Sequence, residues 1–305
     1  SFGVLVPAVA WAQADDATPA EQAAPKTQRI GVIAVPKRSA DSDKALLIQT
    51  LFRTEAQSLK GGSLVLPVDG HNPQDLDQVR EWVEEGTTLM RGNRFTDAAG
   101  LYEEAANILD AYTGIPDRRL AARVFKGRAI VALMAEDKEV ATDYTQRSLL
   151  FWPNQKDTAW GFNMETSRLH RSVTVGWETT PDGGVQVSTS PGRAEVFVDG
   201  LSRGFAPVTV EQLPTGHHHV LVVKDGYIAQ VKWLKVESEN ITPLDLRLSS
   251  TKTAASLGGA LKRFPRVASK SKRAAAALED IADAHGGLDI LLVLMVSESN
   301  KVFKL

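Results

Sequence analysis

The stretch between Val185 and Leu248 constrains the fold most, because short runs rich in valine alternate with turn signals along it. The turn signals are Pro191-Gly192, Asp199-Gly200, Pro214-Thr215-Gly216 and Asp225-Gly226. Glycine adopts the positive φ angles that tight turns need, and β-branched side chains fill a pleated, half-buried surface. The pattern therefore predicts a small all-β module.

The alternation of side chains assigns the two faces of one predicted strand. Ala194, Val196 and Val198 fall on one face, opposite Glu195 and Phe197. Successive side chains of a strand point to opposite sides of the sheet, so the small and branched residues mark the side that faces the core.

These turns and strands also carry a resemblance to a known family. The matching residues are Pro191, Gly192, Ala194, Val196, Val198, Asp199, Gly200, Gly204, Pro207, Gly216, Asp225, Gly226 and Tyr227. With their spacing, they resemble a PEGA domain, a small bacterial β-sandwich found in envelope-associated proteins. The family's Pro-Glu-Gly-Ala signature departs here to Pro191-Gly192-Arg193-Ala194. The resemblance implies a small antiparallel β-sandwich over residues 181–249.

The N-terminal residues indicate export. An apolar run from Phe2 to Trp11 overlaps an Ala10-Trp11-Ala12 site, and polar residues follow. An apolar segment of about ten residues that ends in Ala-x-Ala is typical of a secretory signal and is too short to span a membrane. We interpret residues 1–12 as a signal peptide remnant truncated at its start, and residues 13–28 as a flexible linker. The alternative is a disordered or core N-terminal segment.

Both ends of the remaining chain have the pattern of an α/β unit. Residues 29–68 read as strand, helix and strand, with Leu46, Leu47 and Leu51 near helical spacing. A unit of this size cannot cover both faces of its sheet alone. Residues 257–305 supply a helix and a buried strand over 288–296, and they end within a further strand at 301–305, as if truncated. We predict that the two ends pack into one split α/β layer.

The segment over residues 73–153 changes to a hydrophobic period of about 3.6, which predicts helices. Residues in its first half resemble a tetratricopeptide repeat (TPR) in spacing: Trp82, Gly86, Leu89, Ala98, Tyr102 and Ala105. Small residues let paired helices approach, and large ones fill the space between them. A weaker copy follows at Phe125, Ala129, Ala132, Ala141, Ser148 and Pro153. The alternative is a generic pair of helical hairpins.

Aromatic residues gather near the connector over residues 154–180. They are Trp152, Trp160, Phe162 and Trp177. Aromatic rings can stack on sugar rings, so one interpretation is a glycan platform. The interpretation that we favour is that these side chains seal the joint between the helical and β regions.

No recognisable catalytic motif is present: the sequence lacks a Gly-x-Ser-x-Gly elbow, a His-Glu-x-x-His helix and a phosphate-binding loop. Cysteine is absent, which excludes thiol catalysis and disulfides. His217 and His219 would share a strand face and could chelate a metal with a third ligand, but a polar hairpin entry explains them without one. We therefore predict no catalytic residues, no cofactor and no metal site.

The distribution of charge limits the classes of partner. A formal net charge of −2 argues against a general nucleic-acid binder. A basic run over 261–273 contains Lys262, Arg263, Arg266, Lys270, Lys272 and Arg273 and no acid. It could contact anionic polymers or lipid head groups. The alternative, which we favour, is a solvated loop followed by the start of a helix.

The sequence thus predicts a multidomain α+β protein with TPR-like helical hairpins, a PEGA-like β-sandwich and a split α/β layer. The resemblances imply a bacterial, non-catalytic, secreted or periplasmic envelope protein without a transmembrane span, which mediates protein–protein interaction or scaffolding with unidentified envelope partners. The alternative function is binding of a surface polymer such as glycan or peptidoglycan. Asp199 and Asp225 are interpreted only as turn residues.

Overall fold

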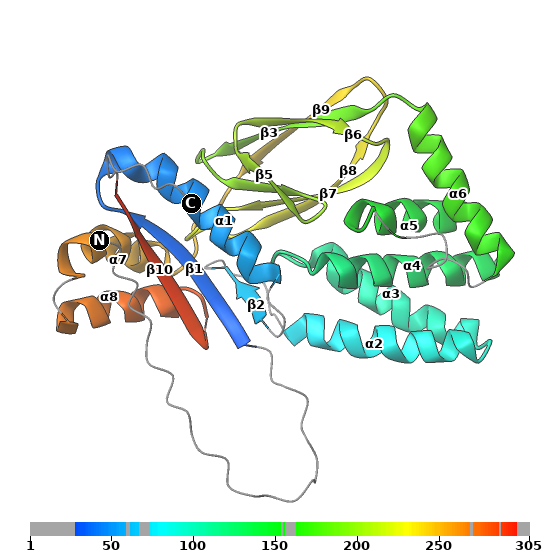
Figure 1. The fold of residues 1–305 in the computed structure, drawn as a ribbon, viewed down its shortest axis with the longest axis horizontal. Helices are drawn as coiled ribbons and strands as arrows, with labels where there is room; N and C mark the ends of the chain where they lie inside the picture. Colours follow the sequence, from blue (N-terminus) through cyan, green and yellow to red (C-terminus); the bar gives the residue numbers. More distant parts are fainter. Residues whose placement is uncertain are drawn as a thin grey trace, which may run out of the picture.

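A computed structural model describes residues 28–58, 62–66, 74–153, 155, 163–268, 271–286 and 288–297. The predictions for the signal remnant, most of the linker, Trp160, Phe162 and the strand at 301–305 lie outside these residues. The described part is mixed α/β, with eight α-helices and three sheets. Figure 1 shows the strand-rich part beside a row of helices, with a smaller α/β layer at one side.

The two ends of the chain share one parallel sheet, which confirms that they contribute to a common α/β layer. Its strands are β1 (Gln28–Pro36), β2 (Gly62–Val65) and β10 (Ile290–Val296), in the order β10-β1-β2. Residues 30–36 of β1 pair with residues 290–296 of β10. The layer's helices are α1 (Ser42–Ser58), preceded by the 3-10 turn η1 (Ser39–Asp41), and α7 (Ala254–Val267) and α8 (Ser271–Asp283).

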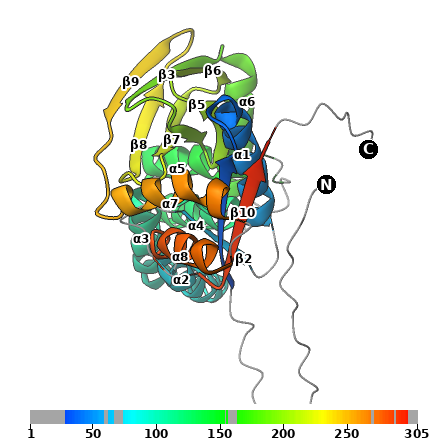
Figure 2. The ribbon, with the colours of Figure 1, turned by 90° about the vertical axis from the view of Figure 1, so that its left-hand side faces the viewer.

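Helices cover both sides of this sheet, which explains the continuous apolar sequence of β1. Val32 packs in a cluster with Ala56 of α1, whereas Ile33 packs with Leu257 of α7 and Ile281 of α8. Figures 1 and 2 show α1 on one side of the sheet and α7 and α8 on the other.

The prediction of a solvated loop at the start of the basic run over 261–273 is wrong. Leu261 to Val267 belong to α7, which begins at Ala254. Leu257, Leu261 and Phe264 recur at helical spacing and pack under the sheet. Burial of this apolar stripe outweighs the local loop signals and the presence of Pro265 in the last turn.

Five helices follow one another in the middle of the chain: α2 (Gln74–Arg91), α3 (Phe95–Ala111), α4 (Arg118–Met134), α5 (Lys138–Phe151) and α6 (Met164–Thr179). Side chains of Asp117 and Asp137 cap the starts of α4 and α5 by accepting backbone N–H groups. Most of the connector forms the helix α6, and Asn163 caps its start. These five helices, residues 74–179, are called the helical region.

Tyr102 is the central contact of the helical region. It is 1% exposed, and a Cβ built at Gly86 of α2 would lie 2.8 Å from its ring. A Cβ at Gly127 of α4 would lie 2.0 Å from the same ring. Ala98 and Ala105 are fully buried beside it, while Trp82 and Leu89 pack partly buried at the edge of the cluster. Two glycines therefore let one tyrosine sit between three helices.

Residues 182–252 form a compact unit of strands, called the β-module. Its strands are β3 (Gly183–Ser190), β4 (Glu195–Val198), β5 (Leu201–Phe205), β6 (Val208–Leu213), β7 (Gly216–Val223), β8 (Gln230–Val236) and β9 (Ile241–Arg247). They form two sheets, β6-β3-β9 and β5-β4-β7-β8. Ala194, Val196 and Val198 are fully buried in the core that the sheets share, on the face that the sequence predicts.

The expectation that this module is antiparallel throughout is wrong for one pair of strands. β3 and β9 run parallel, from Gly184 opposite Ile241 to Ser190 opposite Arg247. They are the first and last strands of the module, and the chain passes through the other sheet between them. No hairpin therefore fixes their relative direction, and a long crossover permits parallel pairing.

The close packing around Tyr102 yields a first prediction. Gly127→Ala is expected to lower the free energy of unfolding by about 1–3 kcal/mol, because the added methyl group overlaps the tyrosine ring. The measurement is urea unfolding followed by far-UV circular dichroism. Gly100→Ala in α3 is the control: nothing lies within 4 Å of its Cβ, so it should be neutral or stabilising by up to about 1 kcal/mol. Equal stability of the two variants would contradict the packing.

Candidate functional site

The two sheets of the β-module have different surroundings. Outward-facing residues of the β5-β4-β7-β8 sheet, including Phe197 and Leu221, are buried against β1, β2 and α1. The outward face of the β6-β3-β9 sheet remains exposed, for example at Gln186 and Asp245. The covered sheet is held at two polar junctions, one with α1 and one with the helical region, and these junctions are the candidate functional site.

The α1 junction begins with unpaired backbone groups of β1. The short strand β2 pairs with β1 only as far as Gly31. Beyond that point, Gln49 accepts the Ala34 N–H at 2.8 Å and the Arg53 Nε donates to the Val32 carbonyl at 3.1 Å. Two side chains of α1 thus complete the edge of the strand, which explains why the helix turns this side inward.

The same two side chains continue into the β-module. Arg53 donates to Asp225 Oδ1 at 2.8 Å, and Gln49 donates to Asp225 Oδ2 at 3.0 Å. Another nitrogen of Arg53 lies 3.6 Å from Glu195 Oε2. Thr50 of α1 and Ser202 of the β-module both donate to Glu195 Oε1. Every carboxylate oxygen at this junction therefore faces a cation or a donor.

Burial of the charged groups at the α1 junction carries an unfavourable desolvation free energy. The side chain of Arg53 is 2% exposed and that of Glu195 is 4% exposed. Burial raises the pKa of Glu195, while the Arg53 charge and the Thr50 and Ser202 hydrogen bonds oppose the rise. A buried ion pair contributes little beyond an apolar contact, but removal of one partner leaves a charge without compensation.

The second junction, with the helical region, is built on the turn between β4 and β5. Asp199 has a φ of 52° and is buried. Its Oδ1 accepts the His219 backbone N–H at 3.0 Å, and its Oδ2 lies 2.7 Å from His218 Nδ1. Arg118 of α4 donates to the Asp199 carbonyl at 3.1 Å. A Cβ at Gly200 would lie 2.8 Å from the Arg118 side chain, so this turn requires glycine for space as well as for conformation.

His218 is fully buried with both ring nitrogens engaged. Nδ1 faces the Asp199 carboxylate, and Nε2 lies 2.7 Å from the Pro214 carbonyl. Both partners are acceptors, so both nitrogens donate only when the ring is protonated. Burial lowers the pKa of His218, but the Asp199 and Pro214 contacts outweigh it and raise the pKa overall. A His–Asp pair can orient a catalytic base, but this one is enclosed and acts as a structural bond.

An arginine between two aromatic rings completes the helical junction. The Arg147 guanidinium of α5 lies 4.4 Å from the Trp233 ring centroid of β8 and 4.9 Å from that of Tyr144. It pairs with Asp143 at 2.8 Å and Asp110 at 3.5 Å. Trp233 also packs edge-on against Phe125 of α4 and His219 of β7. Cation–π contacts gain strength when they are desolvated, as here.

The structure separates the three histidines instead of joining them. His217 contacts Asp143 of α5 at 2.7 Å, His218 is enclosed by the turn, and His219 packs among aromatic rings. Among the described residues, no group of three His, Asp or Glu side chains has metal-site geometry. His217 and His219 therefore contact the helical region, whereas His218 holds the Asp199 turn within the β-module.

The two aromatic residues of the connector that the structure describes also make internal contacts. Trp177 of α6 donates its indole N–H to the Thr215 carbonyl of the β-module at 3.0 Å. Arg119 of α4 lies over the Trp152 ring at 5.6 Å. Trp177 therefore links the helical region to the β-module, whereas Trp152 packs within the helical region.

Sequence reasoning missed the role of the aspartates and most of their partners. Asp199 and Asp225 lie in the turns that the sequence indicates, yet their carboxylates are the anchors of the two junctions. Gln49, Arg53 and Arg147 carry no motif. One signal was available: Ala45, Gln49, Arg53 and Ala56 share one side of α1, whereas Leu47 and Leu51 are 58% and 64% exposed.

The α1 junction predicts an unequal response to the loss of two arginines. Arg53→Met should lower the free energy of unfolding by about 3–5 kcal/mol, because Glu195 and Asp225 lose their buried counter-charge. Arg193→Met, which breaks the exposed pair with Asp43, should cost about 0–1 kcal/mol. Chemical denaturation of both variants checks this, and similar losses would contradict the assignment.

His219 predicts a loss of stability in acid. Burial lowers its pKa to about 4, whereas the unfolded chain has a value of about 6.5. The unfolded state therefore binds the proton first, and stability falls as pH drops from 6.5 towards 4, by about 3 kcal/mol in total. His219→Phe should remove this part of the pH dependence in urea unfolding measured between pH 4 and 8.

His218 provides the matched control, because its contribution has the opposite sign. Its raised pKa stabilises the fold below pH 6.5, and this gain is lost as pH rises through the folded-state value. His218→Gln should therefore retain the acid loss and flatten the limb above pH 6.5. The assignment of His219 is refuted when His219→Phe keeps the wild-type slope between pH 4 and 6.5.

Comparisons with known proteins agree with this geometry in one region. Within the described part of the chain, no helix has the length and apolar character needed to cross a bilayer. Neither the curated proteins nor the solved structures contain a match to the chain. Residues 182–252, which include the whole β-module and its two anchoring aspartates, match the family model described as the PEGA domain.

Proposed function

We propose that this chain is a non-catalytic envelope protein, exported to the periplasm or the cell surface, that mediates protein–protein interaction or scaffolding. In this proposal the PEGA-type module acts as a rigid spacer and docking unit. The helical region, with its TPR-like spacing, receives a segment of a partner protein.

The observation that carries the proposal is the attachment of the β-module on two sides. Asp225 and Glu195 bind α1, while Asp199 and Trp233 meet the helical region. Because the β-module is attached at two separate junctions, it cannot rotate about one of them without breaking the other. A module held in this way suits a protein that keeps other surfaces at a constant distance and orientation.

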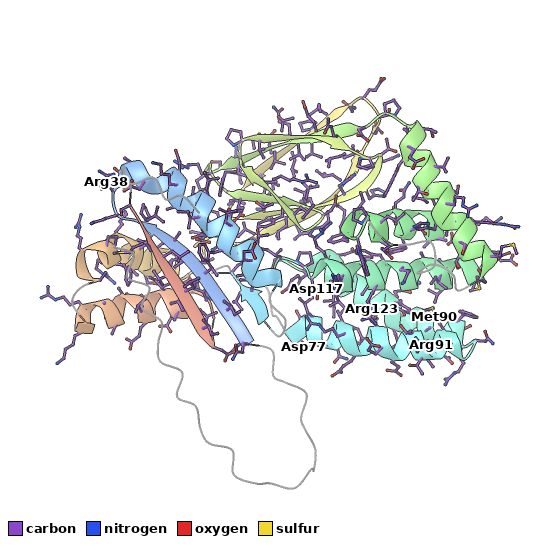
Figure 3. The ribbon with its side chains drawn as sticks, viewed as in Figure 1. Arg38, Asp77, Met90, Arg91, Asp117 and Arg123 are labelled. Atoms are coloured by element: carbon purple, nitrogen blue, oxygen red, sulfur yellow. The ribbon has the colours of Figure 1, made fainter. Side chains whose placement is uncertain are left out.

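The helical region offers an acidic free surface. Its α3, α4 and α5 already contact β8 through Trp233, so that face is occupied within the chain. Exposed carboxylates on α2 and α3 are Asp77, Glu81, Glu84, Glu85, Asp97, Glu103 and Glu104. Asp77, Glu84, Asp97 and Glu103 pair with arginines, whereas Glu81, Glu85 and Glu104 make no ion pair with another described residue. Asp77 and Asp117 lie at the end of the helices nearest the α/β layer (Figure 3), where both contact Arg80. Electrostatic complementarity favours a partner segment rich in lysine and arginine.

Binding of a surface polymer is the alternative, and one observation favours it. The outward face of the β6-β3-β9 sheet is uncovered and polar, with Gln186, Ser188 and Asp245 in neighbouring positions. Such a face could hydrogen-bond a glycan, although neither of the described connector tryptophans lies free to stack on one.

A comparison of two charge-reversal variants distinguishes these functions. Glu81→Lys with Glu85→Lys should weaken capture of cross-linked protein partners from envelope extracts by about tenfold, because the acidic surface of α2 is reversed. Glu211→Lys with Glu237→Lys, at exposed sites of the β-module, is the control and should retain capture. Retention on peptidoglycan or glycan that is unchanged by the helical variant, with no protein partner lost, would contradict the proposal and support polymer binding.

A further inference from the structure

Strand β10 has the sequence of a central strand but the position of an edge strand. Its seven residues, Ile-Leu-Leu-Val-Leu-Met-Val, are all apolar and uncharged. Such continuous runs are typical of strands that are paired on both sides and covered on both faces. Among the described strands, however, β10 pairs only with β1. Ile290 and Met295 are each 43% exposed, and only Val296 is buried.

The other edges of the described sheets carry features that discourage pairing with another chain. β8 exposes Lys232 and Lys235, and β9 contains Pro243, which has no N–H to donate. β2 and β5 have only four and five residues. The pairing of β6 with β3 is interrupted by a register shift. Natural proteins protect sheet edges by these means, and β10 has none of them.

Helix α8, on the same side of the sheet as α7, presents a second unusual surface. Its exposed residues begin with Lys272 and Arg273 and end with Glu279 and Asp283, with Ala275 and Ala276 between them. This order opposes the helix dipole, which favours acids at the start of a helix and bases at its end. Among the described residues, none of these four charged side chains makes an ion pair within the chain, whereas the neighbouring Asp280 binds Arg263 of α7.

We propose that a second copy of this chain binds here, related by a two-fold axis that pairs β10 with β10 in antiparallel orientation. With Val293 at the centre, Ile290 of one copy lies opposite Val296 of the other, and Leu291 lies opposite Met295. Because β10 has no charged residue, this pairing brings no like charges together. It extends the sheet across two molecules at the edge where β10 lies outermost among the described strands (Figure 2).

The same axis explains the charge order of α8. A two-fold axis that reverses β10 also reverses α8, so the two α8 helices approach antiparallel on the same side of the joined sheet. Lys272 and Arg273 of each copy then lie towards Glu279 and Asp283 of the other, and the small Ala275 and Ala276 permit close approach. A parallel arrangement would instead set like charges together. One symmetry operation therefore accounts for both features, and this favours a second copy over an unrelated partner.

Sedimentation equilibrium of the whole 305-residue chain tests the proposal. The wild-type protein should show a reversible monomer–dimer equilibrium in the micromolar range. Ile290→Lys should raise the dimer dissociation constant at least tenfold, because it places a charge at the joined edge. Ile241→Lys, at 41% exposure on β9, is the matched control and should leave the equilibrium unchanged. If the wild-type chain remains monomeric at a protein concentration of roughly 0.2 mM, the proposal is overturned.

Charge variants of α8 test the orientation and do not depend on β10 folding correctly after substitution. Lys272→Glu with Arg273→Glu, and separately Glu279→Lys with Asp283→Lys, should each raise the dissociation constant by about tenfold at low salt. An equimolar mixture of the two variants should form mixed dimers and recover the wild-type affinity. Failure of the mixture to associate overturns the antiparallel arrangement.

Amide hydrogen exchange over residues 290–296 separates a second copy from other coverings of the edge. The proposal expects protection that increases with protein concentration in step with the dimer fraction. Protection that is the same at every concentration would mean that the edge is covered within one molecule, and it would refute the two-fold pairing. None of these outcomes depends on the proposed function.

Discussion

The burial of the Arg53 guanidinium is the constraint on which the arrangement of the molecule depends. A charge that is 2% exposed requires close partners, and Arg53 takes them from two separate parts of the chain: the Val32 carbonyl on β1, and Asp225 and Glu195 in the β-module. Because the strand edge and the carboxylates both need the arginine, neither part can move away without leaving buried polar groups unsatisfied. The junction therefore contributes more to the relative orientation of the two parts than to net stability.

The junction with the helical region achieves the same end by different chemistry. There the β-module contributes the Asp199 turn, which His218 holds from within the module, and a tryptophan, and the helices contribute Arg118 and Arg147. The segment between α3 and α4 adds a third link, since Tyr112 packs in the helical core while Ile115 reaches the cluster formed by β1 and the β-module. The PEGA-type module is consequently enclosed on one sheet and free on the other, and this division supports its proposed role as a spacer.

The parts of this structure that local sequence patterns specify were predictable, and those that depend on distant contacts were not. The turns at Asp199-Gly200 and Asp225-Gly226 identify the β-module, because the turn preferences of glycine and aspartate depend on the local backbone conformation and not on distant contacts. The apolar runs of β1 and β10 likewise indicate one shared sheet. By contrast, Arg53 meets Asp225 across 172 residues, and Thr50 meets Glu195 across 145. No local pattern distinguishes such an arginine from a surface one, and the direction of β9 and the start of α7 were set by tertiary packing in the same way.

The two junctions hold the α/β layer, the helical region and the β-module in one fixed arrangement. The chain contains no cysteine, so spin labels can be attached at introduced cysteines without background. Exposed positions Ala276, Asn107 and Gln186 lie one in each part, and pairs of them report the three distances between parts. Pulsed electron spin resonance on labelled protein, diluted with unlabelled protein, should give one narrow distance distribution for every pair. A broad or divided distance distribution between Gln186 and either other site would contradict a fixed arrangement, because it would show that the β-module moves independently.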